Sequence, residues 1–152
     1  MKKILSILLA VTMVFSLMVG FRAPTAKAAT TLTTSPDIAA GVTFPQGTAT
    51  TVTATVTDVP VCADAYFKVT IFGVASGAVT ITGFTETSAG VFEQAPHLGT
   101  IPAQSSLSQA LTITFSNSVT PANYFMKVEF YDGSTPLASE NGVAIVKAQR
   151  HQ

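Results

Sequence analysis

Apolar and polar residues alternate with a period of two through most of this chain, and this feature constrains its fold more than any other. Residues 48–58 read TATTVTATVTD, so Val52, Ala54 and Val56 share one face while threonines occupy the other. Alternation of this kind, built from Thr, Val, Ile, Phe and Tyr, is typical of half-buried β-strands. No segment after Ala29 has a convincing helical period, so the sequence predicts an all-β domain.

The same pattern predicts several more strands. Clear candidates are residues 65–73, 78–84, 107–115, 124–131 and 142–148, and weaker ones are 30–34, 41–44, 91–93 and 98–101. The residues expected to point inward are Phe67, Val69, Ile71, Val79, Ile81, Leu107, Leu111, Ile113, Phe115, Tyr124, Met126, Val128, Phe130, Val143 and Ile145. Seven or eight short strands with one apolar face each predict a single immunoglobulin-like antiparallel β-sandwich, although a small closed barrel fits the same spacing.

The N-terminal residues 1–28 have the parts of a secretory signal peptide. Lys2 and Lys3 precede an apolar run from Ile4 to Val19, and Ala26-Lys27-Ala28 is a small-x-small cleavage site. The run is shorter than the roughly 20 residues that a membrane-spanning helix needs. We therefore expect cleavage after Ala28, a secreted or cell-surface location and no membrane span in the mature form. An uncleaved N-terminal anchor is the alternative.

The mature chain is expected to form one domain. The sequence predicts a flexible Thr-rich lead or exchangeable strand at 29–37, the sandwich at 38–148 and a disordered tail at 149–152. Cys62 is the only cysteine, so it has no partner for an internal disulfide. We expect it to be a small buried apolar residue, with pairing between chains as the alternative.

Loss of the signal peptide changes the charge of the chain. Eight basic and eight acidic residues balance in the whole sequence, but four of the basic ones lie in the signal peptide. The mature chain then has four basic against eight acidic residues, a formal charge of −4. A mildly acidic domain without a basic stripe argues against nucleic acid and anionic membranes as partners.

The C-terminal half carries a family resemblance. It reads LGTIPAQSSLSQALTITF, then TPANYFMKVEFYDGSTPLASEN, then GVAIV, with Pro121, Tyr124, Asp132 and Gly133 at the steps between strands. This resembles the bacterial immunoglobulin-like modules related to cell-adhesion domains (CARDB-like). The resemblance implies a β-sandwich with a binding or spacer role outside the cell, and it carries over no catalytic residue. Ala122-Asn123 departs from the family pattern, which has glycine after the proline.

The sequence offers little for catalysis. It has neither a G-x-S-x-G elbow nor an H-E-x-x-H motif, and His97 lies in a predicted loop or strand edge. A Cys62–His97 dyad requires the fold to bring the two residues together. Glu86 and Glu93 flank a turn and are expected to be solvated hairpin charges, and the chain has no Trp to provide a sugar platform. We expect a protein that is not an enzyme and has no cofactor.

Calcium is the metal that the sequence best accommodates. Ca²⁺ binds six to eight oxygen ligands, often from loops. Asp58, Asp64 and Asp132 lie in or beside predicted turns, and Glu140 and Asn141 lie in another. No D-x-D-x-D-G run is present, so these are weak calcium candidates, and ordinary turn-forming residues explain them as well.

Several aromatic residues are predicted on the faces opposite the core. They are Tyr66, Phe72, Phe84, Phe125 and Tyr131, and a cluster of such side chains would mark a partner surface. The lead could also add as a strand to a neighbouring copy, with Leu32 filling a pocket, so that copies self-assemble. The sequence thus predicts a non-catalytic structural or adhesive protein with a protein partner, either a second copy or another surface protein. A carbohydrate- or ligand-binding module is the alternative.

Overall fold

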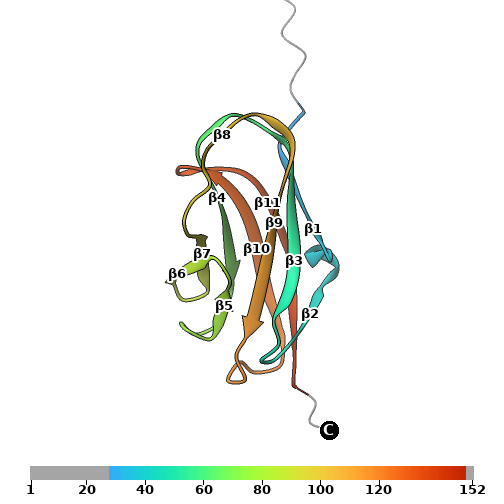
Figure 1. Cartoon of the computed structure of the whole chain (residues 1–152). Helices are drawn as coiled ribbons and strands as arrows, with labels where there is room; N and C mark the ends of the chain where they lie inside the picture. Colours follow the sequence, from blue (N-terminus) through green and yellow to red (C-terminus); the bar gives the residue numbers. More distant parts are fainter. Residues whose placement is uncertain (1–27, 150–152) are drawn as a thin grey trace, which may run out of the picture.

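The computed structural model describes residues 28–149, which run through eleven strands and one short 3-10 helix (Figure 1). The predicted signal peptide, apart from Ala28, and the tail beyond Gln149 lie outside the described residues. The elements are β1 (Thr31–Ser35), η1 (Ile38–Ala40), β2 (Val42–Pro45), β3 (Thr50–Val59), β4 (Cys62–Ile71), β5 (Val79–Ile81), β6 (Phe84–Ser88), β7 (Val91–Gln94), β8 (Gly99–Ile101), β9 (Gln104–Phe115), β10 (Asn123–Asp132) and β11 (Thr135–Lys147). In the described part of the chain, no helix is long and apolar enough to cross a membrane.

The strands form two sheets packed face to face. The four-stranded sheet has the order β1-β3-β9-β5, and the seven-stranded sheet has the order β2-β11-β10-β4-β7-β6 with β8 paired to β4. All pairings are antiparallel except that of β2 with β11. The predicted immunoglobulin-like β-sandwich is therefore confirmed. The strands outnumber the predicted seven or eight because the segment between β4 and β9 is divided into four short ones.

The core lies between the two sheets, where the alternating apolar residues meet. Phe44 of β2, at the edge of the seven-stranded sheet, packs on Phe115 of β9 in the four-stranded sheet, with ring centroids 5.1 Å apart. Within the seven-stranded sheet, Phe67 of β4 packs on Phe130 of β10 at the same distance. The predicted inward residues of β3, β4, β5 and β10 are buried with the exception of Tyr124, which is half-buried. In β9, Leu111, Ile113 and Phe115 are buried, whereas Leu107 is half-buried at the rim.

The predicted facing of the last strand is wrong. Ala144 and Val146 are the buried residues of β11, and Val143 and Ile145 lie on the outer side, half-buried. Gly142 has the same orientation as Ala144 and lies directly under η1. A Cβ added at Gly142 would lie 2.1 Å from the carbonyl oxygen of Ile38, so only glycine permits this approach. The contact between Gly142 and η1 sets which side of β11 faces the core. This contact is long-range, so the alternation within residues 142–148 could not reveal it.

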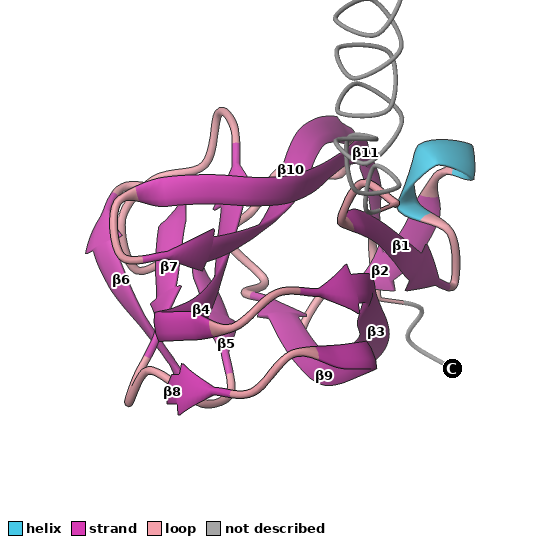
Figure 2. Cartoon of the chain, turned by 90° about the horizontal axis from the view of Figure 1, so that it is seen from above, coloured by secondary structure: helices cyan, strands magenta, loops and turns pink. Residues whose placement is uncertain are grey.

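The predicted lead is also different in the structure. Residues 31–35 form β1, which pairs antiparallel with β3 from Thr31–Thr57 to Ser35–Thr53. Leu32 is 6% exposed and belongs to the chain's own core, so it does not protrude to fill a pocket in a neighbour. Asp37 caps η1 by accepting a hydrogen bond from the amide of Ala39, and Figure 2 shows this helical turn beside β1 and β2. In this structure the segment is an integral strand and not a free lead.

Candidate interaction face

The outer face of the seven-stranded sheet carries a group of charged and aromatic side chains. Alternation places Tyr66 and Lys68 of β4 outward, and the register sets them opposite Tyr131 and Glu129 of β10. Glu93 of β7 lies opposite Lys68 on the other side. Three neighbouring strands thereby bring together groups that are far apart in the sequence.

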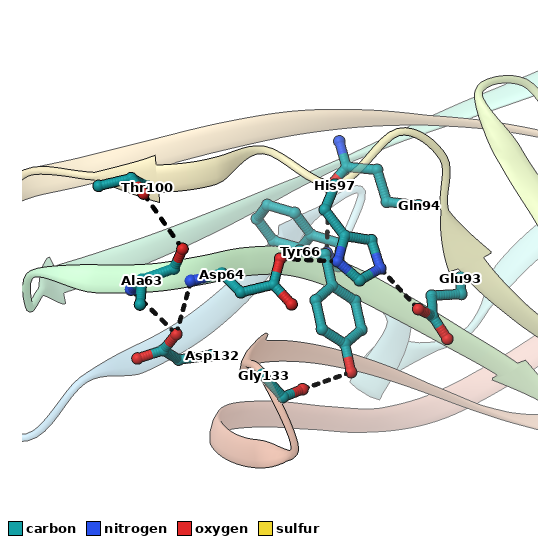
Figure 3. A network of polar contacts seen from close by, with 10 residues as sticks. Ala63, Asp64, Tyr66, Glu93, Gln94, His97, Thr100, Asp132 and Gly133 are labelled. Carbon is teal, nitrogen blue, oxygen red and sulfur yellow. Dashed lines mark hydrogen bonds and ion pairs between the residues drawn. The ribbon is translucent and has the colours of Figure 1, made fainter.

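Aromatic rings form a stack at one end of this face. The Tyr66 ring lies 4.0 Å from the His97 ring and 5.4 Å from the Tyr131 ring, with interplanar angles of 13° in both cases. The Tyr66 hydroxyl donates a hydrogen bond to the carbonyl of Gly133 at 2.7 Å (Figure 3). The Lys68 ammonium lies 5.3 Å from the centre of the Tyr131 ring, within the range of a cation–π contact. Tyr66 is therefore only 8% exposed although it points away from the core.

His97 holds this end of the face together. Its Nδ1 lies 2.8 Å from Asp64 Oδ1 and its Nε2 lies 2.6 Å from Glu93 Oε1 (Figure 3). We call these three residues the His97 clasp. Both ring nitrogens donate only in the protonated imidazolium, and the hydrogen bonds to Asp64 and then to Glu93 raise the pKa of His97 above its ordinary value. The clasp joins β4, β7 and the loop that leads into β8.

The geometry of the clasp does not create a catalytic base. Each nitrogen of the His97 ring already faces a carboxylate, so neither is free to accept a proton from a substrate. Cys62 is buried and its Sγ contacts the carbonyl of Pro60 at 3.4 Å. Burial, followed by the nearby charge of Asp132, raises the pKa of the Cys62 thiol, which disfavours the reactive thiolate. The sequence interpretation of Cys62 as a small buried residue is confirmed.

The two glutamates considered as a carboxylate pair have separate structural contacts. Glu93 belongs to the His97 clasp. Glu86 accepts hydrogen bonds from the amides of Gly77 and Gly90 at 2.7 and 3.1 Å and from the Ser76 hydroxyl at 3.0 Å. The two amide contacts lower the pKa of Glu86. Glu86 thus secures two turns beside the β6–β7 hairpin.

The three weak calcium candidates are divided among different contacts. Asp132 Oδ1 accepts the amides of Ala63 and Asp64 at 3.1 and 2.9 Å, while the carboxylate of Asp64 faces His97. Asp58, the residue before the last one of β3, has a φ of 58°, and its carbonyl accepts a hydrogen bond from the Thr30 hydroxyl. Within residues 28–149, no group of three or more His, Cys, Asp or Glu side chains is arranged to hold a metal ion.

Two aromatic side chains at the other end of the face are exposed. Phe125 of β10 is 73% exposed and Phe72, directly after β4, is 53% exposed. The amide of Phe72 donates to the carbonyl of Phe125 at 2.9 Å, and the preceding pair, Ile71 and Met126, is in register. The two residues are therefore cross-strand neighbours, and we call them the Phe72–Phe125 patch.

The predicted outward aromatics thus have three different environments. Phe72 and Phe125 form the exposed patch, and Tyr66 and Tyr131 belong to the stack. Phe84 is not on the outer face: it pairs with the inward-facing Gln94 and packs, half-buried, against the core. The His97 clasp was not predicted, because only the register of β4 and β7 brings residues 64, 93 and 97 together.

Two hollows in the described surface have mixed polar and apolar linings. One of about 400 Å³ lies between the β3–β4 turn and the start of β9, and Asp58 is its only charged lining residue. Another, of about 180 Å³, lies beside the His97 clasp and is lined by Thr85, Thr87 and Glu93 among others. Glu93 and His97, which both line the second hollow, already contact each other in the clasp.

Comparison with known proteins gives a likeness of fold. No protein-family model and no curated protein matches the sequence. Among solved structures, a chain from a complex of a CaDoc0917 variant with CaCohA2 is similar with a TM-score of 0.45 and 13% identity, over 78% of this chain and 99% of that one. A Niemann-Pick type C2 protein from the Japanese carpenter ant has a TM-score of 0.47 and 9% identity, over 81% and 96%. A non-cellulosomal cohesin from the archaeon Archaeoglobus fulgidus has a TM-score of 0.42 and 10% identity, over 79% and 92%. These likenesses concern the fold and assign no activity.

Proposed function

We propose that this chain is a non-catalytic, secreted structural or adhesive protein that binds a protein partner through the Phe72–Phe125 patch. The exposure of these two cross-strand phenylalanines is the observation that carries the proposal. The signal-peptide pattern of residues 1–28 supports a site of action at the cell surface or in the extracellular matrix. The resemblance of the C-terminal half to CARDB-like modules agrees with that role.

The energetics favour the patch over the rest of the outer face. Full burial of a phenylalanine side chain contributes roughly 1.5–3 kcal/mol, and aromatic residues are common at the centres of protein interfaces. At the opposite end of the face, Tyr66, Tyr131 and His97 already contact one another. A partner that bound there would bury little additional aromatic surface, because these rings already cover one another.

The surroundings of the patch resemble the rim of an interface. Val143 lies opposite Phe125 on β11, and the next outward pair along β4 and β10 is Thr70 with Lys127. All three are partly exposed. An aromatic centre bordered by aliphatic and polar side chains that are partly exposed agrees with the composition of a protein–protein contact.

Fractionation of the cells that naturally make the chain tests this proposal. The mature protein should be found with the surface or matrix fraction. A Phe72→Ser/Phe125→Ser variant should be released into the medium because its contact area has lost both rings. Val61→Ser is the matched control, because Val61 is 69% exposed and lies away from the patch in the β3–β4 turn. Equal retention of the double variant and the wild type, with both folded, would overturn the proposal.

A further inference from the structure

One edge of the four-stranded sheet is open over most of a long strand. β9 pairs with β3 from Gln104 to Ile113, but its other side pairs with β5 only at Ile113–Phe115. Figure 1 shows β5 beside the arrowhead end of β9 only. Among the described strands, none pairs with the segment 104–111 on that side.

The direction of the backbone groups follows from the neighbouring hydrogen bonds. The carbonyl of Thr112 accepts the amide of Thr82, and the amide of Ser116 donates to Ala78, both on the β5 side. Alternate residues of an antiparallel strand point to the same side, so the amides and carbonyls of Ser106, Ser108 and Ala110 face the open edge. The side-chain amide of Gln109 donates to the Ala110 carbonyl at 3.0 Å, a contact that an incoming strand would displace.

This edge lacks the features that usually prevent pairing with another chain. Native edge strands are protected by charge, proline, bulges or short length. The other edges of the two sheets show such features: Pro36 follows β1, Pro45 ends β2, Glu86 lies in β6, and β5 has three residues. In contrast, β9 has twelve residues, reads QSSLSQALTITF and contains neither a charged residue nor a proline.

We propose that a second copy of this chain adds its own β9 to this edge, antiparallel and related by a two-fold axis at Ser108. This register pairs Ser106 with Ala110 of the second copy, Ser108 with Ser108, and Ala110 with Ser106. This register uses the edge-facing backbone groups of Ser106, Ser108 and Ala110 in both copies, and each such pair exchanges two hydrogen bonds. The side chains that meet are serine and alanine, which are small enough not to obstruct the approach.

The contact uses strand addition, as the sequence suggested, but with a different strand. Residues 31–35 already pair with β3, and Leu32 is buried, so they are not free to leave. β9 needs no rearrangement of the backbone to accept a partner. The proposed contact is independent of the Phe72–Phe125 patch, and the two can fail separately.

Sedimentation analysis of the mature chain up to about 1 mM tests the proposal, since short edge contacts give weak dimers. The wild type should dimerise with rising concentration. Ser108→Lys should weaken the dimer roughly tenfold or more, because two like charges would face each other across the axis. Thr55→Lys is the matched control: Thr55 is the neighbour of Ser108 on β3, on the same face but one strand further from the edge.

Two further measurements fix the geometry. An equimolar mixture of the Ser108→Lys and Ser108→Glu proteins should recover the dimer, because opposite charges then meet at the axis. Ser108→Cys should form a disulfide-linked dimer under oxidising conditions, whereas Thr55→Cys should not. A wild type that stays monomeric throughout, or a dimer that Ser108→Lys and Thr55→Lys affect equally, would overturn the proposal.

Discussion

The outer faces of the two sheets differ in chemistry although the same alternation builds both. On the four-stranded sheet, every outward position in β1 and β5, in β3 from Thr51 to Thr57, and in β9 from Ser106 to Thr114, is threonine, serine or alanine. We call this the hydroxyl face. On the seven-stranded sheet, the outward positions include Tyr66, Lys68, Glu129 and Tyr131, which contact one another and the His97 clasp.

The comparison of the two outer faces distinguishes residues that stabilise the fold from residues that are available to a partner. The polar and aromatic groups of the seven-stranded sheet are largely used within the molecule, and what stays open there is the Phe72–Phe125 patch. The hydroxyl face has short contacts between neighbouring strands, such as Thr51–Thr112 at 3.1 Å and Thr55–Ser108 at 3.0 Å. Its small, uncharged side chains leave the edge at β9 accessible.

The largest expected effect comes from breaking the aromatic stack. Tyr66→Ala removes a nearly buried ring that contacts His97 and Tyr131, together with a hydrogen bond to Gly133. We expect the free energy of unfolding to fall by about 3 kcal/mol. Urea denaturation followed by circular dichroism measures it. A loss comparable to that of a surface substitution would show that the stack does not stabilise the domain.

A smaller, pH-dependent effect is expected at the clasp. The folded chain binds the His97 proton more tightly than the unfolded chain, because its pKa is raised by Asp64 and Glu93. This stabilisation is complete below the ordinary histidine pKa of about 6.5 and is lost as the pH rises through the higher folded value. The side chain is 31% exposed, so solvent screening limits the gain.

His97→Gln tests that effect. The variant should be less stable than the wild type by about 1 kcal/mol near pH 6, and by less once the pH exceeds the raised pKa of His97 and the wild-type ring loses its proton. Thermal melts of both proteins across this range give the difference. A gap that stays constant or widens with pH would contradict the protonated clasp.

The smallest effect is expected on the hydroxyl face. Thr55→Ala removes the exposed contact with the Ser108 hydroxyl and should change the free energy of unfolding by no more than about 0.5 kcal/mol. The same urea titration used for Tyr66→Ala measures it. A loss as large as that of Tyr66→Ala would remove the distinction between the two faces.

Local alternation was sufficient to predict most of the fold. The inward faces of β3, β4, β5 and β10 follow directly from the positions of their apolar residues, because a sheet buried on one side has a period of two. In β11, apolar and small residues occur on both sides, so alternation gave the wrong face. The close approach of η1 to Gly142 decides that orientation, and it joins two segments at opposite ends of the domain's sequence.

The candidate surfaces were only partly predictable. Phe72 and Phe125 were expected to point outward, and they do. That they are adjacent depends on the register of β4 with β10, which no local pattern specifies. His97 was expected to be a polar loop residue, since nothing near it in the sequence indicates the contact with Asp64. The open edge of β9 follows from the shortness of β5, a property of the assembled sheet.

Two regions of one face thus have different roles, with binding proposed for the exposed patch and stability for the polar cluster. The most direct test compares surface retention and melting temperature for the wild type, Phe72→Ser/Phe125→Ser and His97→Gln near pH 6. We predict that the double variant melts like the wild type but is released from the cells, whereas His97→Gln melts at a lower temperature but is retained. Release of folded His97→Gln together with full retention of the double variant would contradict this division of roles.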